Sequence, residues 1–373
     1  TWTAAERGAP SFLAQAGTFV DMRSLKRGLV LDLNPVMTAR AVGHRPADDS
    51  WQYRREDPEF GGNLRWGVTS NLTMNATVNP DFSQVEADVG QVVYDPRQAI
   101  AFPEKRPFFL DGSENFAVPN QLIYTRRIVS PAAAAKLNGK VGGLNVGVLT
   151  ALDDEALSRS RDDRPLFNFM RLRRDLGAQS HAGLVYTDYM AGDDYNRVAG
   201  VDARLLVGGR YILSGQLASS FTSVAGVESH ARPLFDLSLV RPGRDWGFNA
   251  VVSGVHPEFS TSSGFIPRSG IARVNVTPRR TFFPAARAVE TVSVSLILDN
   301  SWEYDRFRRG TVPNDIKVNT STNINFRGGW RAQFYTWVES FMYSPDQYRS
   351  YFIERSNGTG GADTVAYTGT HRL

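Results

Sequence analysis

Residues 66–78 alternate between two kinds of side chain, and this alternation constrains the fold more than any other feature. The even positions are almost all apolar: Trp66, Val68, Ser70, Leu72, Met74, Ala76 and Val78. The odd positions are all small or polar: Gly67, Thr69, Asn71, Thr73, Asn75 and Thr77. A period of two places successive side chains on opposite faces of a β-strand, whereas a helix would spread them around its axis. The segment is predicted to be a long strand with one apolar face.

The same alternation returns along the chain, at residues 246–252, 272–276, 291–298 and 316–327. Several of these stretches are longer than the strands of soluble sheets, which usually have about 5–6 residues. The glycine pairs Gly142-Gly143, Gly208-Gly209 and Gly328-Gly329 predict tight turns between strands. We expect an all-β, antiparallel fold with roughly 14–18 strands.

Two architectures fit such strands. No stretch has about 18 consecutive apolar residues, so a transmembrane helix is excluded, but a transmembrane-type β-barrel crosses lipid with alternating strands of about 9–11 residues. The competing interpretation is a large soluble sandwich or propeller with one solvated face. Asn, Thr, Ser, Gly and Arg crowd the polar face, which is typical of a wet lumen. The absence of a fixed-period repeat argues against a propeller. The sequence favours the barrel.

Composition excludes several classes of site. The chain has no Cys, which rules out disulfides, thiolate metal sites and a cysteine nucleophile. Its 42 basic residues are interspersed with 38 acidic ones and form no basic stripe, so we expect no nucleic-acid partner. The five His residues are scattered and show no metal-ligand spacing.

Residues 79–120 break the alternation. They contain Pro80, Pro96, Pro103, Pro107 and Pro119, and proline cannot donate a hydrogen bond to a neighbouring strand. A long irregular segment in a β-protein is usually functional, so we expect a plug or lid. Strand-like alternation resumes near Leu122–Ile128. The expected organisation is a linker from an upstream module at 1–17 and a barrel domain at 18–373.

Two blocks within this region carry a resemblance to a known family. They are Asn79-Pro80-Asp81-Phe82-Ser83-Gln84-Val85-Glu86-Ala87-Asp88 and Phe102-Pro103-Glu104-Lys105-Arg106-Pro107-Phe108-Phe109-Leu110-Asp111-Gly112. Shorter matches lie at 122–128, 136–148, 171–177 and 258–268. The sequence resembles the bacterial family called "domain of unknown function 5916", whose members are outer-membrane-type proteins.

The resemblance implies a C-terminal β-barrel that is commonly preceded by a carbohydrate-binding module of the family-nine type. Two departures stand out. The binding module is absent from these residues, so its sugar affinity cannot be assigned to them. The chain also ends at Thr370-His371-Arg372-Leu373 without a terminal aromatic residue. We therefore expect a fragment cut at both ends, whose barrel is incomplete.

The candidate site consists of charged and aromatic residues in and near the irregular segment. The charged set is Asp81, Glu86, Asp88, Glu104, Arg106, Asp111, Glu114, Arg126, Arg127 and Arg268. The expected aromatic anchors are Phe102, Phe108, Phe109 and Phe116. Because charges removed from bulk water need partners, we expect the acids to pair with Arg97, Arg106, Arg126 and Arg127, fixing the segment to the barrel wall. No catalytic residue and no cofactor is assigned.

Two alternatives for these acids remain open. A hard cation such as Ca²⁺ prefers several carboxylate oxygens. A glycoside hydrolase needs two carboxyl groups across a sugar, and Glu86 with Asp88 or Glu104 would be the candidates. Our hypothesis is a barrel in the bacterial outer membrane, with outer-membrane lipid as its partner. Its lumen would be occluded by residues 79–120, with a role in glycan handling or uptake. The alternative is a carbohydrate-active hydrolase or a carbohydrate-binding surface protein without transport.

Overall fold

The computed structural model describes residues 28–45, 50–55, 57–82, 85–86, 88–90, 99–157, 163–177, 179–228, 230–285, 288–343, 352–356, 362–366 and 371–372. Seventeen strands within these ranges form one sheet. They are β1 (Leu31–Thr38), β4 (Glu59–Thr69), β5 (Leu72–Val78), β6 (Ala133–Val141), β7 (Leu144–Leu152), β8 (Leu166–Asp175), β9 (His181–Ala191), β10 (Asp194–Val207), β11 (Tyr211–Val224), β12 (Val227–Glu228), β13 (Arg232–Arg241), β14 (Trp246–Val255), β15 (Ile271–Phe282), β16 (Val289–Glu303), β17 (Asp315–Phe326), β18 (Arg331–Tyr343) and β21 (His371–Arg372).

The remaining elements are short. Two separate hairpins are formed by β2 (Ala41–His44) with β3 (Gln52–Arg55), and by β19 (Phe352–Ser356) with β20 (Ala362–Ala366). The helices are α1 (Pro107–Leu110), η2 (Ser113–Phe116), η3 (Thr125–Arg127), η4 (Glu155–Leu157) and α2 (Tyr304–Arg308). No helix in the described part of the chain is long and apolar enough to cross a membrane.

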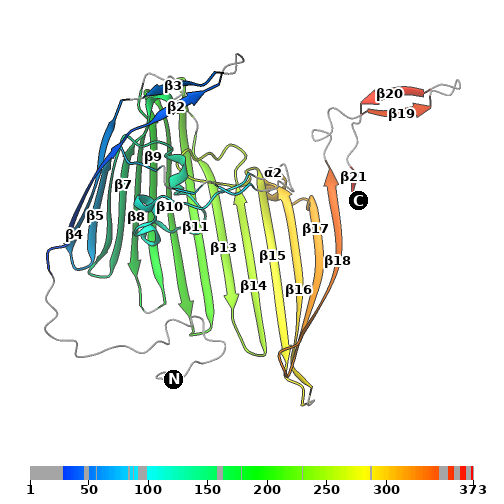
Figure 1. Ribbon diagram of the computed structural model, residues 1–373. Helices are drawn as coiled ribbons and strands as arrows, with labels where there is room; N and C mark the ends of the chain where they lie inside the picture. The colour runs from blue at the N-terminus through cyan, green and yellow to red at the C-terminus, as the bar shows by residue number, and fades with distance from the viewer. Residues whose placement is uncertain are drawn as a thin grey trace.

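Strand pairing is antiparallel and follows chain order almost throughout. β1 pairs with β4 across the β2–β3 hairpin, and from β4 to β18 each long strand pairs with the next. The sheet bends around a hollow, and its outermost long strands, β1 and β18, do not pair with each other (Figure 1). The predicted antiparallel all-β fold and its number of strands are confirmed. The sheet is open in the described chain, so closure into a barrel stays a prediction.

The single long strand predicted over residues 66–78 is wrong: β4 ends at Thr69, the chain turns at residues 70–71, and β5 begins at Leu72 and pairs back along β4. Trp66 and Met74 are cross-strand partners on the same face, so the period of two continues through the turn and hides it.

The two ends of the sheet differ in the length of their connections. At one end the hairpins turn within a few residues, as at Gly142-Gly143, where both glycines have positive φ (53° and 79°). This backbone suits the twist of a two-residue hairpin and favours glycine. Gly208-Gly209 and Gly328-Gly329 also have positive φ and lie in short connections at the same end, as predicted, although these connections are longer than the one at Gly142-Gly143. The opposite end carries the long connections between β5 and β6, β14 and β15, and β16 and β17.

The alternation seen in the sequence becomes two chemically different faces. On β11, Gln216 points into the hollow and is 1% exposed, whereas its neighbour Leu217 points outward and is 52% exposed. Across β16, β17 and β18 the cross-strand register aligns Leu298, Val318 and Val338 on the convex face. It aligns Asp299, Lys317 and Glu339 on the concave face. Because the long strands all belong to this one sheet, its apolar face has no second described sheet stacked against it.

Candidate functional site

Two irregular connections fold back into the hollow from the end with long loops (Figure 1). We call residues 99–132 the inserted segment and residues 256–270 the short insert. Backbone hydrogen bonds join them: Ala99 N to Pro267 O (3.0 Å), Tyr124 N to Ser263 O (2.9 Å) and Phe265 N to Gln121 O (2.7 Å). The Nε of Arg127 also donates to Gly264 O over 3.0 Å. The two connections therefore form one layer on the concave face.

The position of the inserted segment corrects one boundary. The sequence predicted that alternation resumes near Leu122–Ile128, but the structure places η3 there, and β6 begins only at Ala133. Leu122 and Ile128 are fully buried, which produced the strand-like pattern. The carbonyls of Thr125 and Ile128 accept hydrogen bonds from Arg106 (2.8 and 2.6 Å) rather than from a neighbouring strand. The irregular region thus extends past residue 120 to residue 132.

Aromatic side chains anchor the inserted segment to the sheet. Phe109 (2% exposed) and Phe116 (8%) lie in a cluster with Leu149, Phe167 and Phe169 from the concave faces of β7 and β8. Phe108 is partly buried and meets Phe109 edge to face, with ring centroids 5.0 Å apart. Phe102 is half-buried, and its backbone N–H and carbonyl both bond to the hydroxyl of Tyr124, each over 2.9 Å.

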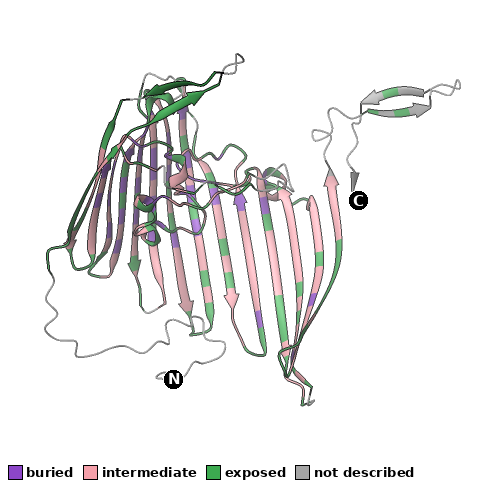
Figure 2. Ribbon diagram, in the orientation of Figure 1, coloured by how far each residue is buried: buried purple, intermediate pink, exposed green. Residues whose placement is uncertain are grey.

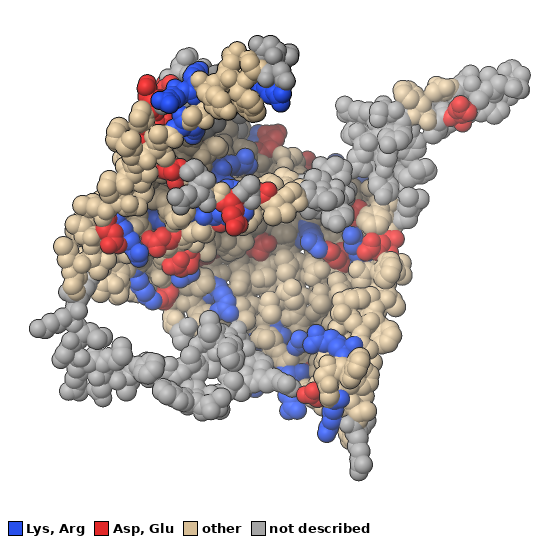
Figure 3. All heavy atoms as spheres, in the orientation of Figure 1, with Lys and Arg blue, Asp and Glu red and all other residues tan. Residues whose placement is uncertain are grey.

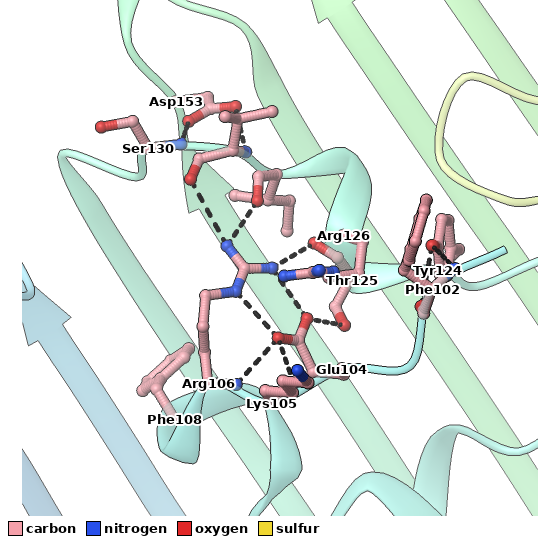
Figure 4. Close-up of polar contacts among 12 residues, drawn as sticks. Phe102, Glu104, Lys105, Arg106, Phe108, Tyr124, Thr125, Arg126, Ser130 and Asp153 are labelled. Atoms are coloured by element: carbon pink, nitrogen blue, oxygen red, sulfur yellow. Dashed lines mark hydrogen bonds and ion pairs between the residues drawn. The ribbon is translucent and has the colours of Figure 1, made fainter. Parts of the chain in front are cut away.

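A second set of contacts surrounds Glu104 and Arg106 (Figure 4). The carboxylate of Glu104 accepts hydrogen bonds from Arg106 Nε (2.8 Å) and Nη2 (2.7 Å), and its Oε2 also accepts from Thr125 Oγ1 (2.6 Å). The Arg106 guanidinium lies 4.2 Å from the ring centroid of Phe109. Burial alone would raise the pKa of Glu104, but the bonds from Arg106 and Thr125 outweigh it and hold this pKa below its ordinary value. The pair fixes the turn at the base of α1.

The other candidate acids lie at separate places. Asp88 forms ion pairs with Arg126 and with Lys105, the latter over 3.6 Å. Asp111 accepts a hydrogen bond from Asn75 on β5 (2.9 Å) and lies 3.9 Å from Arg65.

Asp81 lines a cavity of about 320 Å³ together with Asp111. Glu86 is exposed, and its backbone carbonyl accepts from Lys105. The exposed Glu114 accepts from Asn115 over 3.4 Å.

The candidate basic residues also lie at separate places and have different partners. Arg106 and Arg126 form ion pairs with acids, whereas Arg127 donates a hydrogen bond to the Gly264 carbonyl of the short insert. Arg268 is partly buried in the short insert. Arg97 falls outside the described residues, as does the predicted linker at 1–17. The structure therefore divides the predicted network into local pairs.

The strand wall beneath these segments carries buried charges that the sequence analysis missed. Arg171 on β8 and Asp202 on β10 form an ion pair, Nη2 to Oδ1 over 2.8 Å, with side chains 2% and 1% exposed. Arg171 reaches β10 across Gly183 of β9, where a Cβ atom would lie 2.3 Å from Arg171 Nη1. Arg171 Nε also donates to Ala117 O of the inserted segment (3.2 Å). The available signal was a charged residue at an alternate position of a strand, since Arg171 shares its face of β8 with Phe167 and Phe169.

Further wall residues bind the two segments through their backbones. Lys136 on β6 is 2% exposed and donates from Nζ to the carbonyls of Phe108 and Asp111. Gln216 Oε1 on β11 accepts from the N and Nδ2 of Asn120, both over 2.9 Å. Asn196 on β10 accepts from Ser262 N in the short insert (2.7 Å). These side chains satisfy backbone groups that leave regular structure inside the hollow.

The concave face of β15–β18 lacks such a cover. Figure 2 shows buried residues gathered on the strands near the inserted segment, whereas β15–β18 are mostly intermediate or exposed. Asn, Ser and Thr dominate this face, for example Asn275, Ser295, Asn319, Ser321 and Asn323. Tyr335 (55% exposed) and Trp337 (68%) share the face on β18.

The contacts of the candidate carboxylates suit a structural role better than metal binding or proton transfer. In the ranges that the structure describes, no group of three or more His, Asp or Glu side chains could hold a metal ion. Both oxygens of Glu104 are engaged by Arg106, and its lowered pKa is the opposite of what a general acid needs. Asp88 is engaged by two cations.

These observations define a class by geometry: one antiparallel sheet bent around a polar hollow that an irregular segment partly fills. Residues 30–142 match the model of the family described as "Domain of unknown function (DUF5916)". The resemblance inferred from the sequence is confirmed over this range. The preceding carbohydrate-binding module is not part of the match.

A comparison with curated proteins finds no match. Among solved structures the chain is similar to Pseudomonas aeruginosa OpdL, at 12% identity over 84% of this chain and 85% of that chain, with a TM-score of 0.36. It is also similar to Pseudomonas aeruginosa OccK11 (OpdR), at 12% identity over 83% of this chain and 94% of that chain, with a TM-score of 0.32. The third similar structure is Pseudomonas aeruginosa OccK8 (OprE), at 12% identity over 83% of this chain and 96% of that chain, with a TM-score of 0.28. TM-scores of this size do not establish a shared fold.

Proposed function

We propose that this chain forms the wall of a β-barrel channel in the bacterial outer membrane, with lipid against the convex face and solute passing along the concave face. The observation that carries the proposal is the chemical difference between the two faces of a single sheet. Leu184, Leu217 and Leu237 on the convex face are 49%, 52% and 44% exposed. A continuous apolar surface of this kind is unfavourable in water and favourable against lipid chains.

Strand length and polarity support the same proposal. β10 and β11 each have 14 residues and β16 has 15, more than the roughly 9–11 residues with which a tilted strand crosses the hydrocarbon core. A sheet within lipid must leave no open edge, because unpaired backbone groups are costly there. In the membrane, the edges at β1 and β18 therefore need partners. The end with short turns would face the periplasm and the end with long loops the exterior.

Glycan uptake is the finer form of the proposal. The concave face of β15–β18 offers amides and hydroxyls, which can exchange hydrogen bonds with sugar hydroxyls, and Tyr335 and Trp337 offer aromatic surface. The inserted segment would narrow the hollow and set which solutes pass. We expect liposomes containing the protein to admit neutral oligosaccharides, measured by liposome swelling. Exclusion of every sugar tested, by a protein that conducts ions, would contradict the glycan assignment.

The membrane assignment can be tested with two adjacent residues of β16. Leu296 lies on the convex face and Ser295 on the concave face. Leu296→Arg places a charge against lipid, which costs about 2–4 kcal/mol near the middle of a bilayer, so folding into liposomes should fall. Ser295→Arg is the matched control, and we expect it to fold like the wild type and to shift ion selectivity. Folding is measured as heat-modifiable migration in detergent. Equal behaviour of the two variants, or release of the wild type from membranes by carbonate, would overturn the proposal.

A further inference from the structure

The ends of three hairpins meet at the short-turn end of the hollow and line an open cavity of about 780 Å³. The turns join β13 to β14, β15 to β16 and β17 to β18, and the lining includes Thr281, Thr291 and Asn325. In Figure 3, Lys and Arg side chains gather at this end of the hollow, below the acids and bases of the inserted segment. We call the cavity the arginine pocket.

Three arginines line the pocket: Arg244, Arg279 and Arg331. Each is held by an uncharged neighbour. Arg279 Nη2 donates to Gly243 O (2.7 Å), Arg331 Nε donates to Asn325 Oδ1 (3.0 Å), and the Arg244 guanidinium lies 4.3 Å from the ring centroid of Phe283. These contacts orient the guanidinium groups and leave most of their N–H donors available.

The charge of the pocket is unbalanced. Glu290 is the single acid among its lining residues, and within the described ranges none of the three arginines forms an ion pair. Several basic groups elsewhere on the concave face are paired with carboxylates, as in Arg171 with Asp202, Arg273 with Asp299 and Lys317 with Glu339. An excess of positive charge in a concave site attracts and holds anions.

We infer that the arginine pocket binds the carboxylate or phosphate group of a solute that enters the hollow. A guanidinium presents paired N–H donors whose spacing matches two oxygens of a carboxylate or phosphate. A neutral sugar has no such charged pair of oxygens. The inference rests on the proposed function and deepens it by naming the substrate class, an acidic solute. The same chemistry would also accept the phosphate of a lipid headgroup, so the test must separate a free solute from a lipid.

The test measures equilibrium binding by calorimetry, with the protein purified in a zwitterionic detergent and free of added lipid. The probes are glucuronate, glucose 6-phosphate and glucose. We expect the wild type to bind both anions at least tenfold more tightly than glucose, with an affinity that falls as salt increases. Equal affinity for glucuronate, glucose 6-phosphate and glucose would overturn the inference without any variant.

Variants locate the site. Arg279→Gln and Arg331→Gln should each weaken glucuronate binding about tenfold. Arg280→Gln is the matched control, because Arg280 follows Arg279 in sequence but lies on the convex face opposite Val294; it should bind like the wild type. Arg331→Lys keeps the charge without the paired donors and should bind with intermediate affinity. Unchanged binding in both Gln variants would overturn the assignment to this pocket.

A lipid arm separates the two sources of phosphate. Phosphatidylcholine vesicles with and without phosphatidic acid are added to wild type and Arg279→Gln. Loss of phosphatidic acid binding in the variant, with glucuronate binding intact, would overturn the solute assignment in favour of a lipid. Because calorimetry in detergent needs no conduction, a protein that binds anions but does not conduct refutes the proposed function and leaves the pocket standing. A protein that conducts but does not prefer anions refutes the pocket alone.

Discussion

The concave face has two regions of opposite character. On the covered wall, formed by β6–β11, apolar residues such as Leu149 and Phe169 face the hollow and are buried by the inserted segment. On the uncovered wall, formed by β15–β18, the equivalent positions are mostly polar or charged, with Asn, Ser and Thr concentrated on β16 and β17. Apolar residues therefore face the hollow where a second layer removes them from water. The comparison teaches that alternation in the sequence identifies a sheet with one apolar and one polar face. Apolar residues at positions that face the hollow identify the strands against which another segment packs.

The largest expected effect is a loss of stability when the buried ion pair of the covered wall is broken. Asp202→Asn leaves the Arg171 guanidinium buried without its counter-charge, and this should lower the free energy of unfolding by about 3–5 kcal/mol. Asp299→Asn is the matched control on the uncovered wall. It breaks the pair with Arg273, whose side chain is 55% exposed, and should cost at most about 1 kcal/mol. Urea unfolding in detergent micelles measures both, and similar losses would remove the distinction between the walls.

The next effect concerns the anchoring of the inserted segment. Phe109→Ala removes a fully buried ring that also contacts the Arg106 guanidinium, and should destabilise the docked segment by about 3 kcal/mol. We expect faster cleavage within residues 99–132 by a protease, with the strands still protected. Leu110→Ala, at a neighbouring side chain that is 45% exposed, should leave the cleavage rate nearly unchanged. If both variants are cleaved at the wild-type rate, the ring does not hold the segment in place.

The smallest effect is a dependence on pH. The folded pKa of Glu104 lies below its ordinary value of 4.5, so its ionised form stabilises the docked segment above that value. This stabilisation should decline as the pH falls through the lowered pKa, and the protection of the amides of residues 99–132 against hydrogen exchange, relative to the intrinsic rate at the same pH, should then decrease.

Glu104→Gln removes the negative charge and replaces one of the two acceptor oxygens that Arg106 contacts with an amide N–H donor. It should weaken docking by about 1–3 kcal/mol at neutral pH. It should also remove the contribution of Glu104 to the dependence on acid, whereas Glu114→Gln, at an exposed site, should retain it. A wild-type acid response in Glu104→Gln would place the sensitive group elsewhere.

Much of the fold was predictable because the period of two is a local property of the chain. The long strand around 316–327 and the turns at the glycine pairs follow from residue type and spacing. The single strand predicted over 66–78 was wrong, because the alternation continues across the turn at residues 70–71 that separates β4 from β5. The strand predicted near Leu122–Ile128 was wrong, because burial against a wall produces the same apolar spacing without a paired neighbour. The sequence named Arg106 and Arg126 as bases for the candidate acids but could not tell which acid meets which base. A contact such as Asn75 with Asp111 joins residues far apart in the chain and could not be read from the sequence.

The sequence by itself determined that this chain forms long antiparallel strands with one apolar and one polar face, and that residues after 78 leave the sheet. Residue type fixes these properties through steric preference and hydrophobic spacing, which act over a few residues. Only the tertiary structure decided which part of the polar face is covered. It also decided that Arg171 crosses Gly183 to reach Asp202, and that three arginines line one cavity. These outcomes depend on the strand register and on the way two connections fold into the hollow, and both arise from contacts between distant segments.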